Sequence, residues 1–558
     1  MDTKEEEIRD MKKFVSAACT GLVCLSMAAC GSGASGSGAA GSDGGSGDSK
    51  KRITLAKEND VISMNTAYAT DGFSFEMIAA TVDGLEAMDK DGNVVPALAE
   101  SYDISDDELT YTFHLRDANW SNGDPVTAGD FVFAWNETAK SPEAEYAYLF
   151  TQDGACIKNA DEIVYDQKDT DLGIKAVDDK TLAVQLSKKC PYFLSLLTFP
   201  VFYPINQEFF EEQGDQYALT PDGLLACGPY VLTEWTKGQS LKLDKNQDYW
   251  DADNVAIDGM DVNIVPEVST SALDFENGNT DWTKLNSTLV DKYKDNEAYD
   301  TFLEGYLWYL QFNMNNEYLK NDNLRKAIGT VVDRDNLVNN VLKDGSINIG
   351  GFVPQDFTTG PDGKDYRETA DKFYTEVGED GLKAAQEYWD KAKKELGVDK
   401  ITLKMLYEPS DPSKPAAEFI QSEIQKLDGI TIEMVSQEKE NRIEKQKQGD
   451  FDIVLTRWGP DYADPTTYLN LMITGNAYNY GKYSSEEYDA KMKEAAEAET
   501  PEERWTLLQE AEKILMEDSP VVGIFQVGGA SLKNPKVTGI EDHSFGVPYI
   551  YKNVKIEE

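Results

Sequence analysis

A short apolar run that begins at Phe451 and ends in the turn Gly459-Pro460 constrains the fold of this chain more than any other stretch. The run Phe-Asp-Ile-Val-Leu is apolar and rich in β-branched residues, which predicts a short buried strand. Because proline lacks an N–H donor and glycine admits unusual φ angles, the chain must turn there. The turn leaves Asp461 just beyond the end of a strand, which is where open α/β sheets bind their ligands.

The side chains around Asp461 allow two interpretations. Trp458 and Tyr462 flank it, and a carboxylate between aromatic rings suits a cationic group such as an amine. In the alternative, Asp461 caps the following helix and both aromatic side chains belong to the core. Composition alone favours the alternative.

Length and charge limit the classes of function. A chain of 558 residues is too long for one ordinary core, so we expect two or more lobes. The net charge of −48 argues against nucleic-acid binding, which needs clustered Lys and Arg. Only two histidines occur, His114 and His543, so a histidine-based triad or a multi-histidine metal site is nearly excluded. We expect His114, within an alternating stretch, to be structural.

The N-terminal segment predicts a secreted lipoprotein. A basic start at Met11 is followed by the apolar segment 14–29, which is too short for a comfortable membrane span. Small residues before Cys30 resemble a bacterial lipobox, with Met27 where leucine is usual, so we expect cleavage before Cys30 and lipidation of its thiol. Residues 1–10 are acidic, which suggests that translation starts at Met11. The alternative is an ordinary signal peptide with a chance cysteine.

The next segment, 31–51, is rich in Gly, Ser and Ala and predicts a flexible tether with a reach of roughly 25 Å. No later apolar run is long enough for a transmembrane helix. Cys156, Cys190 and Cys227 match no metal motif, and either three free thiols or one disulfide with one thiol is possible.

The stretch 457–469 resembles the ligand loop of the periplasmic and lipoprotein oligopeptide-binding proteins of ABC importers, the peptide/nickel type of extracellular solute-binding protein family 5. Blocks that resemble the same family follow in family order along the chain, each of them unremarkable in isolation: 109–116, 118–135, 171–193, 227–250 and 324–335.

The resemblance implies an α/β, two-lobed, periplasmic-binding-protein-like fold of the large peptide-binding type, with an extra subdomain and a hinge between the lobes. We therefore expect a signal peptide (1–30), a tether (31–51), lobe I (52–301) with an inserted subdomain at about 86–195, lobe II (302–525) and a return to lobe I (526–558).

It also implies the ligand-binding residues. Asp461 would pair with the α-ammonium of a bound peptide, and the other candidates would line the cleft: Trp458, Gly459, Tyr462, Arg457, Tyr148 and Phe73. Leu455 stands where tight binders of the family carry an arginine, and Arg457 lies two residues on, on the same face if the strand continues. How the C-terminal end of the peptide is held, and hence its length, is left open.

The implied function is that of an extracytoplasmic, lipid-anchored, monomeric binding protein that delivers oligopeptides to an ABC permease, without cofactor, metal or catalysis. Alternatives are a peptide-sensing receptor, a binder of another small solute on the same fold, and a secreted hydrolase with two carboxyl groups roughly 5–9 Å apart. The scarcity of histidine disfavours a nickel binder.

We expect Cys30→Ala to release the protein from membranes or to leave the precursor uncleaved, because stable anchoring requires lipid chains on this residue. Fractionation of cells that express the two proteins, with immunoblotting for size, tests this. A processed Cys30→Ala protein that stays with the membranes would contradict the lipobox.

Overall fold

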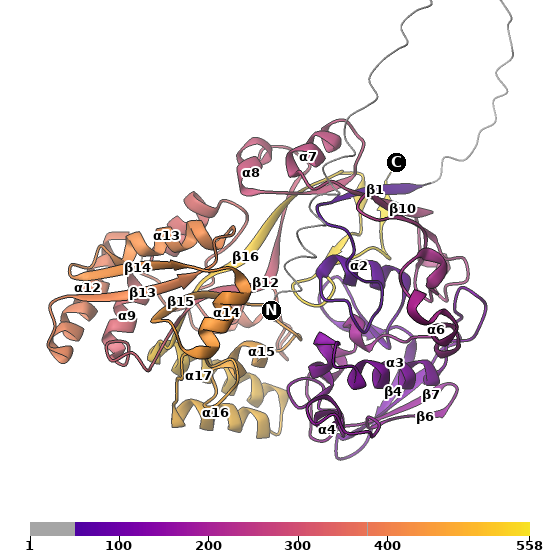
Figure 1. The fold of residues 1–558 in the computed structure, drawn as a ribbon, viewed down its shortest axis with the longest axis horizontal. Helices are drawn as coiled ribbons and strands as arrows, with labels where there is room; N and C mark the ends of the chain where they lie inside the picture. Colours follow the sequence, from indigo (N-terminus) through magenta and orange to yellow (C-terminus); the bar gives the residue numbers. More distant parts are fainter. Residues whose placement is uncertain (1–50, 377, 558) are drawn as a thin grey trace, which may run out of the picture. The chain divides into compact units, whose positions relative to one another are not determined.

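A ten-stranded mixed sheet is the largest element of the computed structural model, which describes residues 51–376 and 378–557 (Figure 1). Strands β12 and β16, of 14 and 13 residues, lie at its centre. In spatial order the strands are β14 (Ile430–Ser436), β13 (Ile401–Tyr407), β15 (Ile453–Trp458), β12 (Tyr299–Phe312), β16 (Val521–Lys533), β11 (Trp282–Leu285), β1 (Arg52–Lys57), β10 (Gly259–Ile264), β9 (Ser240–Lys245) and β8 (Tyr230–Thr236).

The sheet contains two parallel groups, β14-β13-β15 and β11-β1-β10, and is antiparallel at its centre and at the β10-β9-β8 end. β13 pairs in parallel with β14 and β15, and β1 pairs in parallel with β10 and β11. β12 pairs antiparallel with both β15 and β16. Parallel strands need crossover connections, and helices supply them here, so the expected α/β fold of the large solute-binding type is confirmed.

Separate hydrophobic cores lie on the two sides of the central pair. One core draws its side chains from strands β1, β8, β9 and β10 and from the chain between them, with Trp120, Trp135 and Phe202 fully buried. A second packs α9 (Asp322–Val331), α12 (Gly378–Leu396) and α13 (Ser413–Ile424) on β12–β15, around Trp308 and Trp389. A third lies under α16 (Glu486–Glu497) and α17 (Pro501–Asp518). The two-lobed arrangement follows from these cores.

A second, four-stranded antiparallel sheet belongs to the first core. It contains β4 (Ala99–Ile104), β5 (Thr110–Leu115), β7 (Thr181–Gln185) and β6 (Ile174–Asp178), in that order. Local sequence explains both elements: β5 alternates buried and partly exposed residues, and α3 (Ala128–Lys140) begins after Thr127, whose N–H donates to Asp130 Oδ2 at 2.8 Å. His114 Nε2 lies 2.9 Å from Asp103 Oδ2 on the neighbouring strand, as a structural histidine would.

Turn residues and hydrogen bonds between distant segments set several element boundaries. β2 (Glu86–Met88) and β3 (Val94–Pro96) form a hairpin around Gly92, whose φ is +80°. α2 (Gly72–Thr81) ends three residues before Gly84, because the carbonyl of Thr81 accepts hydrogen bonds from the N–H groups of Cys227 and Gly228. The helical region 484–517 is divided at Pro501, which cannot donate to the preceding turn.

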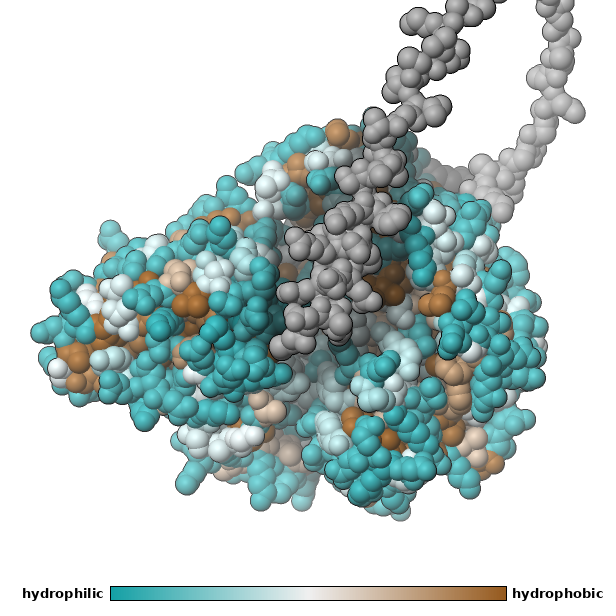
Figure 2. Space-filling model, in the orientation of Figure 1, coloured by the Kyte–Doolittle hydropathy of each residue, from teal (hydrophilic) through white to brown (hydrophobic). Residues whose placement is uncertain are grey.

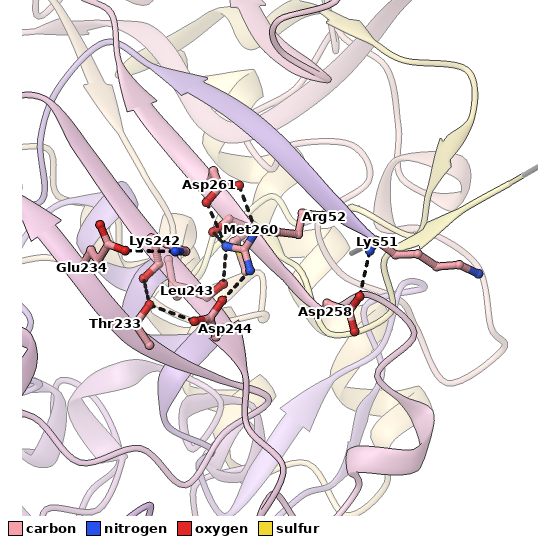
Figure 3. A network of polar contacts seen from close by, with 10 residues as sticks. All are labelled: Lys51, Arg52, Thr233, Glu234, Lys242, Leu243, Asp244, Asp258, Met260 and Asp261. Atoms are coloured by element: carbon pink, nitrogen blue, oxygen red, sulfur yellow. Dashed lines mark hydrogen bonds and ion pairs between the residues drawn. The ribbon is translucent and has the colours of Figure 1, made fainter. Parts of the chain in front are cut away.

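Arg52 anchors the start of the folded chain. Its guanidinium lies 2.5 Å from Asp244 Oδ1 and 2.9 Å from Asp261 Oδ1, and it also donates to the carbonyls of Leu243 and Met260 (Figure 3). One side chain thus connects β1 to β9 and β10. The expected signal peptide, Cys30 and all of the tether except Lys51 lie outside the described residues.

The structure decides between the two states that the sequence left open for the cysteines. Cys156, Cys190 and Cys227 are buried free thiols. Across 51–376 and 378–557, no helix combines the length and the hydropathy that a membrane span requires. The face in Figure 2 is mainly hydrophilic, in keeping with the 28% charged composition.

A buried ion pair ties the segment around α11 (Tyr366–Thr369) to α17. Arg367 Nη2 donates to Glu512 Oε2, and both side chains are almost fully buried. The other carboxylate oxygen of Glu512 accepts the backbone N–H groups of Phe352 and Val353, at 2.7 and 3.0 Å. Both carboxylate oxygens of Glu512 therefore accept hydrogen bonds from within the protein.

We expect Glu512→Leu to lower the free energy of unfolding by about 3–5 kcal/mol, because it leaves the Arg367 charge buried without a partner. The double variant Arg367→Met/Glu512→Leu should recover part of the loss. Urea unfolding followed by circular dichroism measures both, and a single variant as stable as the parent would contradict the role of this pair.

Candidate ligand-binding cleft

The loop after β15 is held by close contacts on both sides. β15 runs antiparallel to β12 and ends at Trp458, which is opposite Leu307, so the expected strand and turn are confirmed. A Cβ at Gly459 would lie 2.4 Å from the Tyr306 ring, and one at Gly305 would lie 2.6 Å from Pro460. These approaches require glycine, and they bring the loop against β12.

Within this loop Asp464, rather than Asp461, serves the short helix α15 (Thr466–Leu469). Asp464 Oδ1 accepts the Thr466 N–H at 3.0 Å, and both carboxylate oxygens accept from Arg504, at 2.7 and 2.8 Å. Asp461 contributes its backbone N–H to Thr467 Oγ1 at 3.2 Å. The capping alternative for Asp461 is therefore wrong, because the carboxylate that accepts the first N–H of α15 belongs to Asp464.

The Asp461 carboxylate lies among tyrosines. Tyr146, Tyr148, Tyr306 and Tyr478 lie close to it: burial raises their pKa values, and the charge of Asp461 raises them further. Burial raises the pKa of Asp461 to about 6, against 3.8 ordinarily, and the nearby Tyr148 hydroxyl lowers it only in part. Within the described residues Asp461 forms no ion pair, so its charge is available to a ligand.

A cavity of about 770 Å³ opens beside the carboxylate, within the range of small-ligand sites. Of the predicted site residues, five line it: Phe73, Arg457, Trp458, Gly459 and Asp461. Trp458 packs edge-on against Tyr478, with ring centroids 4.8 Å apart. The loop after β15, helix α2 and strand β12 therefore all border the same cavity.

Two predicted residues lie behind this lining. Tyr148, on a 3-10 turn at Glu145–Phe150, does not line the cavity but lies close enough to Asp461 for the carboxylate to raise its pKa further than burial alone does. Tyr462 is 3% exposed and stacks on Tyr192, with ring centroids 4.0 Å apart. It joins the first hydrophobic core, and so it fixes the loop from behind.

Other residues that line the cavity were not predicted from the sequence. Lys57 lies 2.6 Å from Glu76, and its ammonium is 4.6 Å from the centre of the Trp282 ring and 4.7 Å from that of Tyr549. Burial lowers the pKa of Lys57 and raises that of Glu76. These residues are up to about 490 positions apart, so only folding relates them. Tyr306 also lines the cavity, and its signal was the aromatic run of β12.

The raised pKa makes Asp461 a destabilising residue in the ligand-free protein at neutral pH. The folded state holds the proton more tightly than the unfolded chain, so stability is lost as the pH rises from about 4 to about 6. A shift of about two pKa units corresponds to about 3 kcal/mol.

We therefore expect ligand-free Asp461→Asn to be up to about 3 kcal/mol more stable than the parent at pH 7.5 and equally stable at pH 3.5. Urea unfolding after refolding, to remove bound ligand, measures the difference. Asp464→Asn is the matched control and should be destabilised at pH 7.5, because Arg504 loses its partner. Loss of stability in Asp461→Asn at pH 7.5 would contradict the prediction.

Known proteins with this architecture identify the family. A family model described as "Bacterial extracellular solute-binding proteins, family 5 Middle" matches residues 93–480. The chain is 33% identical over 538 residues to a dipeptide-binding protein of Lactococcus lactis subsp. cremoris, which covers 92% of this chain and 96% of the relative. It is 30% identical over 513 residues to the oligopeptide-binding protein OppA of Bacillus subtilis, which covers 89% and 91%.

A solved structure of a peptide-binding protein has the same fold. Listeria monocytogenes OppA bound to peptide superimposes with a TM-score of 0.71 at 34% identity, over 91% of this chain and all of that one. The ten-stranded sheet, the cleft loop and these similarities lead to one conclusion: the chain belongs to family 5 of the bacterial extracellular solute-binding proteins.

Proposed function

We propose that this protein captures peptides in its cleft, with the peptide's α-ammonium bound by Asp461. The observation that carries the proposal is a carboxylate in a cavity wall with a pKa raised by burial and no cationic partner in the described chain. Such a group gains most from a ligand that brings a positive charge. The names of the relatives from Lactococcus lactis and Bacillus subtilis, a dipeptide-binding and an oligopeptide-binding protein, support a peptide as the ligand.

The remaining predicted site residues have supporting roles in this proposal. Trp458 and Phe73 form apolar walls, and Gly459 allows close approach of a peptide backbone. Tyr148 orients the carboxylate through its hydroxyl, and Tyr462 holds the loop through its stack on Tyr192. Backbone groups of the peptide would be met in a strand-like manner, which gives affinity with little sequence dependence.

Capture is proposed to involve closure of the two lobes about β12 and β16. β12 pairs with β15 and β16, and β16 pairs with β12 and β11, so these two long strands connect the two halves of the sheet. Hinge closure around a ligand is common in binding proteins of this kind. We propose lobe I at 52–301, with an inserted subdomain at about 86–195, lobe II at 302–525, and the return to lobe I at 526–558.

Delivery to an ABC permease from the outer face of the membrane completes the proposal. The lipobox at Cys30 and the tether at 31–51 would hold a monomeric binding unit near the membrane surface. Membership of an extracellular solute-binding family supports binding over catalysis.

Asp461→Asn should weaken peptide binding at least tenfold, because it keeps the shape of the carboxylate but removes its charge. Acetylation of the peptide N-terminus should weaken binding to the parent protein to a similar degree. Calorimetric titration of both proteins with free and acetylated tri-alanine gives the four affinities.

The two changes act on one interaction, so their combined effect should be much smaller than the product of the separate fold-changes. Asp153→Asn, which alters a carboxylate that does not line the cavity, is the matched control and should bind like the parent. Independent, fully multiplicative losses, or parent-like binding by Asp461→Asn, would overturn the proposed role of Asp461.

A further inference from the structure

Two of the three buried thiols meet at one backbone oxygen. The Cys156 thiol lies 3.5 Å from the carbonyl oxygen of Gly154, and the Cys190 thiol lies 3.6 Å from the same oxygen. Both cysteines are almost fully buried, and the structure holds both in the reduced form. The two sulfur atoms are therefore neighbours, although they come from distant parts of the sequence.

Backbone pairing holds the two segments together independently of the thiols. Ile157 forms an antiparallel bridge with Leu186. The carbonyl of Cys156 accepts the Ser187 N–H at 2.7 Å and the Ser187 hydroxyl at 3.0 Å. Cys190 follows shortly after this pairing. A disulfide needs Cα atoms about 4.4–6.8 Å apart, so thiols that share one acceptor on paired segments can bond with little movement of the backbone.

The two thiols also differ in acidity. The neighbouring Cys190 thiol is the main cause that lowers the pKa of Cys156, and Lys188 lowers it further against the effect of burial. Burial raises the pKa of Cys190. Because the thiolate is the nucleophile in disulfide exchange, Cys156 is the better attacking group and Cys190 serves as the second, resolving thiol.

We infer that Cys156 and Cys190 form a redox-active pair that is oxidised to a disulfide in the exported protein and covalently joins segment 151–157 to segment 187–192. The family is extracellular, and disulfides form and persist in oxidising compartments outside the cytoplasm. Since both thiols are buried in the folded protein, the bond forms while the chain folds, before the two segments pack.

The co-reactant is a low-molecular-weight disulfide. Cys156 loses its proton to solvent, and its thiolate attacks one sulfur of that disulfide and releases one small thiolate, which takes up a proton. Cys190 then loses its proton and attacks the Cys156 sulfur, which releases the second small thiolate, protonated in the same way. The protein loses two protons and two electrons, and the small disulfide gains them and becomes two thiols.

The disulfide would lie behind the ligand loop. Tyr192, close to Cys190 in sequence, stacks on Tyr462, with ring centroids 4.0 Å apart. On the other segment, the Thr151 hydroxyl donates to the carbonyl of Tyr148 at 2.7 Å. The bond would join these two supports, and so it would brace the part of the first core on which the ligand loop packs.

Refolding of the full chain from urea, in an equimolar mixture of reduced and oxidised glutathione, tests the pair. Free thiols are then blocked with N-ethylmaleimide in denaturant, and peptide mapping by mass spectrometry reports the state of each of the six cysteines. We expect the linked Cys156–Cys190 peptide in at least about nine of ten chains, because structural disulfides of exported proteins resist reduction by glutathione. Cys227 should carry the maleimide.

Stability gives a second measurement. The parent refolded with glutathione should unfold at a temperature at least about 3 °C higher than the parent refolded in dithiothreitol, because the cross-link restricts the unfolded chain. Circular dichroism measures both midpoints. The difference should vanish in Cys190→Ser and remain in Cys227→Ser, the matched control, which also replaces a buried thiol of the first core.

The parent protein alone decides the outcome, even where a serine variant fails to fold. Recovery of both Cys156 and Cys190 as maleimide adducts after refolding with glutathione would overturn the inference. A map in which either residue is linked mainly to another cysteine would overturn it as well. Neither result bears on peptide binding at Asp461.

Discussion

The antiparallel pairing of β12 with β16 is the constraint on which the other features depend. The ladder runs from Tyr299 opposite Leu532 to Gln311 opposite Val521, so its hydrogen bonds continue from one half of the sheet into the other. β11 pairs with β16 on one side of this pair, and β15 pairs with β12 on the other side. The register is interrupted between Leu303 and Leu307, at the level of the cavity. Irregularities of this kind redirect side chains, and here Glu304 and Tyr306 face the cavity.

The cleft loop illustrates how one segment combines stability with binding. Asp464 is satisfied by a helix N–H and by Arg504, whereas Asp461, three residues earlier, has a tyrosine hydroxyl and no cation in the described chain. The first carboxylate stabilises the loop, and the second costs stability until a ligand arrives. Binding sites commonly retain such locally unfavourable groups because the surrounding structure compensates for them. The stack of Tyr462 on Tyr192 is one such compensation.

The charge of the cavity lining differs from the net charge of the whole chain. The chain is strongly acidic, yet Lys57, Lys284, Lys439, Arg442, Lys447 and Arg457 all line the cavity. Five carboxylates line the cavity too, Glu58, Glu76, Glu304, Asp461 and Asp542, so positive and negative groups nearly balance there, unlike in the chain as a whole. The net charge therefore describes the solubility of the protein and says little about what the cleft binds.

Local sequence determined the strand before the ligand loop, its end at Gly459-Pro460, the hairpin around Gly92 and the start of α3, because each depends on the backbone preferences of a few neighbouring residues. The family resemblance added the two-lobed fold and the residues of the loop. Only the tertiary structure decided which of two nearby aspartates caps a helix, that Tyr462 is buried while Tyr306 faces the cavity, and that Arg457 lies over rings of β12 without an ion-pair partner. The physical reason is distance along the chain. Burial, pKa and partner choice depend on residues such as Tyr148, Tyr192 and Arg504, which come together only when the two lobes fold around β12 and β16.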